Sequence, residues 1–224
     1  MTVLHLADEG EAADLAAFLS RLLHYDRGAA VRLQAHGTAL AVFGRPPSFE
    51  VLAVRAVRLA KPYEDGLDVT LDVTVSAGEL LESVDEPAAT ATVPGAVTGP
   101  PWAGVLPPRG GWRPEPGLPA PDALRALVAA AVAEFRSRTG ELAPEKRTRT
   151  ELDRIGREIW SRTVGDTGLP VRAVHAAQSL GFLRPAAGDG AALVSSGAWL
   201  RLRTPYGSVA LRRAGTGALG LSVR

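Results

Sequence analysis

Hydrophobic positions near the N-terminus repeat with the period of an α-helix. Large apolar side chains recur at i, i+3, i+4 and i+7 in the set Leu15, Phe18, Leu19 and Leu22. Asp8 and Glu11 precede this stripe with the spacing of a capping box. The pattern predicts an amphipathic helix that packs on a sheet through its four apolar side chains.

The next 50 residues follow the two-residue period of β-strands. We expect strands over residues 31–35, 38–43 and 49–59, with a turn at His36-Gly37 and a break over residues 44–47. The clearest alternation lies in residues 67–76, where every second residue is Leu or Val, so one face is buried and the other wet. Residues 78–86 are acidic and predict a short helix or a loop. Together these segments predict an antiparallel meander.

A stretch rich in proline and glycine follows from Pro94 to Pro121 and contains two tryptophans, Trp102 and Trp112. Such composition is typical of a domain boundary. We therefore expect an α+β antiparallel-sheet domain over residues 1–98, a linker over residues 99–121, and a second domain over residues 122–224.

The second domain begins with three predicted helices, over residues 121–138, 150–162 and 170–181. A β-hairpin follows, with strands over residues 199–203 and 208–213. Pairing Thr204 with Gly207 places Leu202 opposite Val209, so that the apolar faces of the two strands coincide. The fold class is therefore α+β: a helix on an antiparallel sheet, a Pro/Gly-rich connection, and a three-helix unit followed by a hairpin.

The residues that carry catalysis or bind metals are scarce and scattered. The chain has no cysteine, and its four histidines form no ligand cluster, so we expect no metal and no redox cofactor. Asp68 and Asp72 share one strand face, but four residues at ~3.3 Å each put them about 13 Å apart, beyond the ~5 to 9.5 Å of glycosidase pairs. No nucleophile elbow or phosphate-binding loop is present. We therefore identify no catalytic residue, and an unrecognised small-molecule enzyme stays an alternative.

Composition indicates where in the cell the protein resides and how much a single arginine says about binding. The longest apolar run, Ala126 to Ala133, is far short of the ~20 residues of a membrane-spanning helix, and the acidic N-terminus does not suit a signal peptide. We therefore expect a cytoplasmic protein. Arginine outnumbers lysine 23 to 2, the residue usage of a GC-rich genome of the actinobacterial type, so a single arginine indicates little by itself.

The charge is divided unevenly along the chain. Residues 1–120 hold nine Lys or Arg against 15 Asp or Glu, whereas residues 145–224 hold 13 against six. This asymmetry predicts either two halves that attract each other or a basic module that binds a polyanion such as nucleic acid.

The order of three helices and a basic hairpin resembles that of a winged helix-turn-helix domain over residues 122–213. The resemblance implies DNA binding, with the third helix in the major groove and the hairpin as the wing. On the helix, Arg172, His175 and Ser179 form the polar stripe that would face the groove. On the hairpin, Arg201, Arg203 and Arg212 share one face with Trp199 and would contact phosphates. The loop over residues 184–192 departs from the family's pattern.

A protein partner is the other alternative for a non-enzymatic regulatory or interaction protein. Trp102 and Trp112, with Arg109 and Arg113 beside them, could offer aromatic and cationic contacts to another protein. The same segment could instead be a linker that its tryptophans fasten to the domain.

Overall fold

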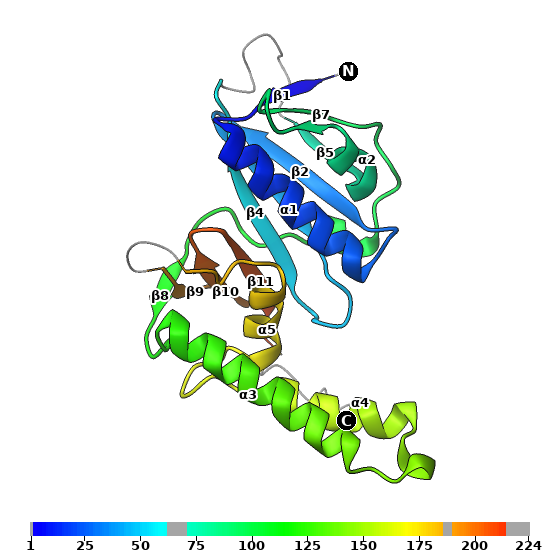
Figure 1. Cartoon of the computed structure of the whole chain (residues 1–224). Coiled ribbons are helices and arrows are strands. Elements are labelled where there is room, and N and C mark those ends of the chain that lie inside the picture. The colour runs from blue at the N-terminus through cyan, green and yellow to red at the C-terminus, as the bar shows by residue number, and fades with distance from the viewer. Residues whose placement is uncertain (1, 62–70, 186–189, 214–224) are drawn as a thin grey trace, which may run out of the picture.

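A computed structural model describes residues 2–61, 71–185 and 190–213 of the chain. Figure 1 shows an upper part, in which helix α1 lies across a sheet, and a lower part from which two helices project as an arm. The α+β fold class expected from the sequence is confirmed. Within the described residues, strands form one three-stranded sheet and one eight-stranded sheet, and all their pairings are antiparallel.

The N-terminal helix, α1 (Glu9–Tyr25), forms as its apolar stripe predicts. The Asp8 side chain accepts a hydrogen bond from the Glu11 N–H at 2.9 Å and so caps the first turn. All four stripe residues are at most 1% exposed, and they pack in the core against the sheet. The prediction that this helix packs on an antiparallel sheet is confirmed.

The eight-stranded sheet has the order β5-β2-β3-β4-β11-β10-β9-β8 and therefore runs through both halves of the chain. Its first half consists of β2 (Ala30–His36), β3 (Ala39–Gly44), β4 (Leu52–Arg58) and β5 (Asp72–Ser76). Its second half consists of β8 (Arg113–Glu115), β9 (Ala192–Ser196), β10 (Trp199–Thr204) and β11 (Gly207–Arg212). The halves join where Val209 of β11 pairs with Ala53 of β4.

A small sheet at the upper end holds strands that the sequence pattern did not predict. It is made of β1 (Val3–His5), β6 (Val84–Asp85) and β7 (Thr90–Thr92), in the order β1-β7-β6. The acidic segment before it forms a short helix, α2 (Ala77–Glu82). These strands are two or three residues long, too short to show an alternation.

One expected strand begins later than the sequence suggested, and another is described only in part. The strand expected from Phe49 begins at Leu52, because Ser48 and Glu50 adopt positive φ angles of 69° and 54° that interrupt extended backbone. The strand expected over residues 67–76 is described only from Leu71, with β5 starting at Asp72, and its earlier residues lie outside the described part. Asp72, one of the two aspartates considered above as a catalytic pair, forms an ion pair with Arg32 at 2.7 Å.

The C-terminal half supplies α3 (Pro121–Gly140), α4 (Arg149–Trp160) and α5 (Val171–Ser179), close to the three helices expected. Short 3-10 turns lie at Pro101–Gly104 and Pro144–Lys146. Helices α3 and α4 form the projecting arm of Figure 1, and α5 packs on β11. Among the described residues, no helix is long and apolar enough to cross a membrane.

The hairpin of β10 and β11 has the predicted register, with Thr204 opposite Gly207, Leu202 opposite Val209 and Leu200 opposite Leu211. The hairpin is not a free wing of the kind expected from the winged helix-turn-helix resemblance. Strand β9 pairs with β10 on one side and β4 pairs with β11 on the other, so both edges of the hairpin are occupied. The hairpin is therefore an interior part of the large sheet.

Candidate functional site

The six residues proposed for DNA binding fall into two groups on opposite faces of the large sheet. Helix α5 covers the inner face, together with α1, because its buried side chains pack against the core side of β11. The register places Arg201, Arg203 and Arg212 on the outer face, since their neighbours Leu200, Leu202 and Leu211 point inward. This arrangement differs from a recognition helix and a wing that contact one duplex together.

The α5 residues are engaged within the protein. Arg172 Nε lies 3.2 Å from a Glu50 carboxylate oxygen, and the His175 ring stacks on Trp160 with a centroid distance of 4.7 Å. Ser179 is half-buried at the last residue of α5. The polar stripe of α5 is therefore less buried than the opposite side of the helix, but its side chains contact other parts of the protein and are not free to contact a DNA groove.

The three hairpin arginines and two tryptophans form a group that we call the arginine face: Arg201, Arg203, Arg212, Trp112 and Trp199. Arg203 and Arg212 are exposed, whereas Arg201 is half-buried. Arg201 Nε donates a hydrogen bond to Ser208 Oγ at 2.8 Å, and its guanidinium carbon lies 5.5 Å from the centre of the Trp112 ring. Trp199 pairs with Arg212 across the two strands.

The arginine face is a concentration of uncompensated positive charge. Residues 190–213 contain four arginines and no acidic residue. Arg213 pairs with Glu115 at 2.5 Å, but among the described residues none of the other three has a carboxylate partner. Burial lowers the pKa of Arg201, and repulsion from Arg203 lowers it further, although arginine stays charged at any physiological pH. An external anion would relieve this repulsion.

The uneven charge of the chain is neutralised in part between its two halves. Arg184 pairs with Asp14 at 2.6 Å, and Arg172 pairs with Glu50. Both contacts join a cation of the basic third to a carboxylate of the acidic N-terminal part. Mutual attraction of the halves and a residual basic surface, the two explanations suggested by the sequence, therefore coexist.

The proline-rich segment crosses the outer face, behind the sheet in Figure 1. Trp102 and Leu106 pack on a small cluster of Phe43, Leu52 and Val54, so Trp102 fastens the segment to the sheet. Trp112 donates from its indole nitrogen to the Pro108 carbonyl oxygen at 3.1 Å and lies near Arg201. Arg109 and Arg113 are exposed. The two tryptophans proposed to bind a partner therefore lie in different surroundings, Trp102 on an apolar cluster of the sheet and Trp112 beside Arg201.

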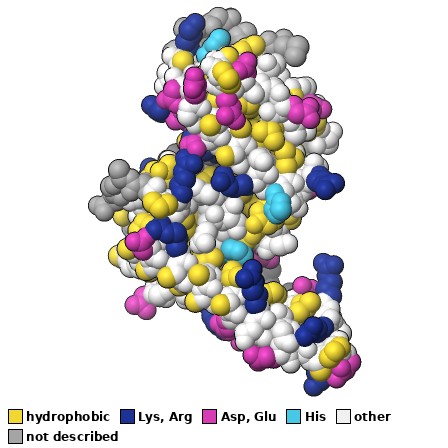
Figure 2. Space-filling view, viewed as in Figure 1, with side chains coloured by type: hydrophobic (Ala, Val, Ile, Leu, Met, Phe, Trp, Pro, Cys, Tyr) yellow, Lys and Arg dark blue, Asp and Glu magenta, His cyan; other side chains and the backbone are white. Residues whose placement is uncertain are grey.

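A cleft of about 680 Å³ lies on the inner side, between the β3–β4 loop and helices α3, α4 and α5. Figure 2 shows this side of the molecule hollowed where the arm leaves the body. We call it the aromatic cleft because its walls include Phe49, Phe135, Trp160 and His175. The sequence did not predict this cleft, because nothing local brings these segments together.

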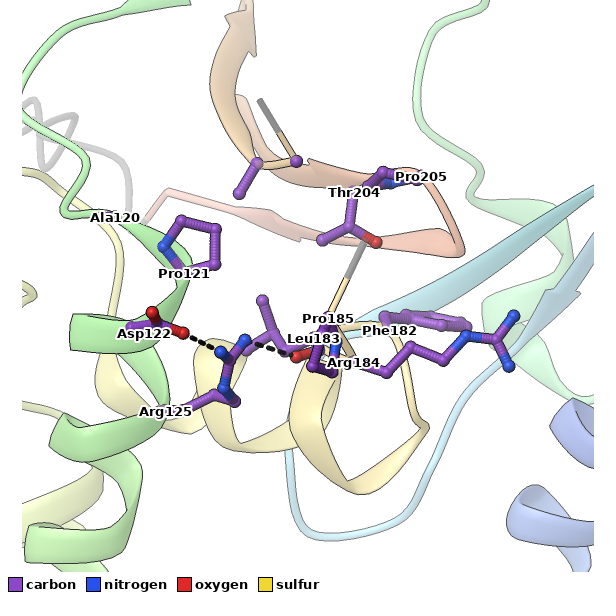
Figure 3. A pocket seen from close by; sticks show the side chains of 12 residues that line it. Ala120, Pro121, Asp122, Arg125, Phe182, Leu183, Arg184, Pro185, Thr204 and Pro205 are labelled. Carbon is purple, nitrogen blue, oxygen red and sulfur yellow. Dashed lines mark hydrogen bonds and ion pairs between the residues drawn. The ribbon is translucent and has the colours of Figure 1, made fainter. Parts of the chain in front are cut away.

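A smaller cavity of about 290 Å³ lies where α3 begins (Figure 3). Arg125 fills one side of it, donating to the Asp122 carboxylate and, at 3.0 Å, to the Leu183 carbonyl oxygen. Arg125 therefore fastens the start of α3 to the segment after α5.

Two family models match the chain, each over slightly less than half of its length. The model described as "Domain of unknown function (DUF8010)" matches residues 1–104, and the model described as "Domain of unknown function (DUF8185)" matches residues 107–216. Their boundary falls within the segment predicted as a linker. No curated protein matches the chain. The winged helix-turn-helix resemblance and the proposed domain limits stay predictions.

Among solved structures, the chain is similar to the DNA polymerase sliding clamp from Pseudomonas aeruginosa. For that clamp the identity is 13% over 97% of this chain and 66% of the clamp chain, with a TM-score of 0.46. For the same clamp with ligand, the identity is 14% over 92% and 63%, again with a TM-score of 0.46. The chain spans slightly less than two thirds of the clamp chains, and a TM-score below 0.5 does not establish a shared fold.

Proposed function

We propose that this protein is an interaction module that binds nucleic acid through its arginine face. The observation that carries the proposal is the group of three cations, Arg201, Arg203 and Arg212, none of which has a carboxylate partner in the part of the chain that the structure describes. Phosphate groups are the anions best matched to arginine, which donates hydrogen bonds in a planar fork. Such contacts read no sequence, because they involve the backbone of the nucleic acid.

Single strands suit this face better than duplex DNA. Trp112 and Trp199 are partly exposed beside the arginines, and unpaired bases stack on aromatic side chains in sequence-tolerant binding. A duplex hides its bases, and the helix that would read its groove lies on the other side of the sheet. The proposal therefore keeps the three hairpin arginines and does not use Arg172, His175 and Ser179.

Binding to a fluorescent oligonucleotide of 20 thymidines, measured by anisotropy at low salt, tests the proposal. The double variant Arg203→Ala/Arg212→Ala should bind at least about tenfold more weakly, because two phosphate contacts are removed. Arg27→Ala/Arg136→Ala is the matched control, since these arginines are also exposed and lack carboxylate partners among the described residues. The proposal fails if both double variants bind as wild type does, or if wild type does not bind at all.

A further inference from the structure

Five aromatic rings cross the inner side of the molecule in an unbroken row. Tyr25 at the end of α1 contacts Phe49, Phe49 contacts His175, His175 stacks on Trp160, and Trp160 meets Phe135. The successive centroid distances are 5.4, 5.2, 4.7 and 6.1 Å. The row connects the N-terminal half to all three helices of the C-terminal half. Four of these rings line the aromatic cleft, in a chain where only 5% of residues are Phe, Trp or Tyr.

Several polar groups in the cleft have no partner. Among the described residues, the Trp160 indole N–H and the His175 ring nitrogens make no hydrogen bond, and the Arg157 guanidinium has no carboxylate partner. These nitrogens are open to solvent, since only Arg55 Nε and Arg172 Nε are buried without a hydrogen-bond partner among the described residues, and they are therefore accessible to a ligand. On the rim, Glu50 is paired with Arg172 and Asp153 lies 3.8 Å from Arg149, which leaves Arg157 as the cation available to a ligand.

The floor of the cleft is shaped by a glycine in the middle of α4. Gly156 is buried, and a methyl group added there would stand 3.5 Å from Trp160 and 3.7 Å from Phe135, in ordinary contact. Packing alone therefore does not require glycine, although glycine weakens a helix interior. The missing side chain leaves room between the Phe135 and Trp160 rings.

We propose that the aromatic cleft binds a segment of a partner protein that inserts an aromatic side chain and places a carboxylate near Arg157. The rings offer stacking faces, the free indole N–H offers a donor to a peptide carbonyl, and Arg157 supplies the complementary charge. A cleft open along the body suits an extended segment better than a small molecule, because small ligands bury most of their surface in enclosed pockets. This site is separate from the arginine face and lies on the opposite side of the sheet.

The test begins with the full chain and a phage-displayed library of random 12-residue peptides. Enriched peptides should carry an aromatic residue with Asp or Glu a few positions away, and the synthetic peptide should bind the protein in a fluorescence titration. Gly156→Leu, which fills the floor, and Arg157→Glu, which reverses the rim charge, should each weaken that peptide by about tenfold or more. Arg157→Glu keeps the test valid if the leucine variant fails to fold.

Arg136→Glu is the matched control, since this exposed arginine of α3 does not line the cleft, and it should leave peptide affinity unchanged. The proposal is overturned if no peptide is enriched, if enriched peptides lack aromatic residues, or if both cleft variants bind normally. It is also overturned if sedimentation shows a dimer that Gly156→Leu dissociates, because the occupant is then a second copy. Peptide binding should persist in Arg203→Ala/Arg212→Ala, so failure of the nucleic-acid proposal is recognised separately.

Discussion

Arg55 of β4 is the only charged side chain that is fully buried among the described residues. Its guanidinium lies 2.9 Å from Glu11 and 3.2 Å from Asp14 of α1, and it donates to the Tyr206 carbonyl oxygen at 2.7 Å. Arg55 therefore connects α1 to the turn of the C-terminal hairpin. No sequence pattern identified it, because a lone arginine in an apolar strand is indistinguishable from an exposed one until its partners are known.

Replacing Arg55 by alanine should destabilise the protein by about 1.5 to 3 kcal/mol, because buried hydrogen bonds to charged groups are lost while Glu11 and Asp14 keep Arg58 and Arg184 as partners. Urea denaturation measures the loss. Arg58→Ala is the comparison, since Arg58 contacts the same Glu11 at 2.9 Å but is 71% exposed, and solvent screens such pairs. Equal losses in the two variants would contradict the structural role of Arg55.

His175 should make the stability of the protein depend on pH. Burial lowers its pKa, so the folded chain holds the proton less tightly than the unfolded chain. As the pH falls through the ordinary histidine range, the unfolded state takes up more protons and is favoured. The melting temperature should therefore fall between pH 7.5 and pH 5.5 by more in wild type than in His175→Phe, in which the ring is uncharged. Parallel curves would show that His175 titrates normally.

Strands whose buried and exposed side chains alternate could be predicted from the sequence, and strands without that alternation could not. The register of β10 and β11 could be derived because a slip of one residue would bury arginines opposite leucines. The strand β9 was missed because only Leu193 and Val194 in it are buried, adjacent rather than alternating. Strand β4 carried a usable signal: residues 51–54 are apolar on both faces, which is typical of a strand covered on both sides.

The turn between β10 and β11 depends on a glycine that packs against an aromatic ring. A Cβ added to Gly207 would stand 2.5 Å from the Phe182 ring, which is itself buried and stacked on Phe18 with a centroid distance of 5.6 Å. Gly207→Ala should therefore lower the free energy of unfolding by about 1 to 3 kcal/mol, the usual cost of overpacking. Gly95→Ala, where nothing lies within 4 Å, should change little. A tolerated alanine at Gly207 would mean that the Phe182 ring moves aside readily.

In the whole molecule, the sequence predicted several helices and strands but not how the two halves of the chain pack together. It predicted the fold class, the long helices and the hairpin, all of which depend on local periodicity. It did not predict that β11 pairs with β4, because local periodicity carries no information about which of two strands about 150 residues apart will pair. That junction turns Arg201, Arg203 and Arg212 away from α5, and it brings Phe49 into the aromatic cleft.

If the arginine face binds single-stranded nucleic acid through phosphate contacts, the affinity should fall steeply as the salt concentration rises. The affinity of wild type and of Arg203→Ala/Arg212→Ala for the thymidine oligonucleotide would be determined at several salt concentrations. Each contact to a single strand contributes about −0.7 to the slope of log K against log salt, so the double variant should be shallower by about 1.4. Equal slopes for the two proteins would show that Arg203 and Arg212 do not contact phosphates.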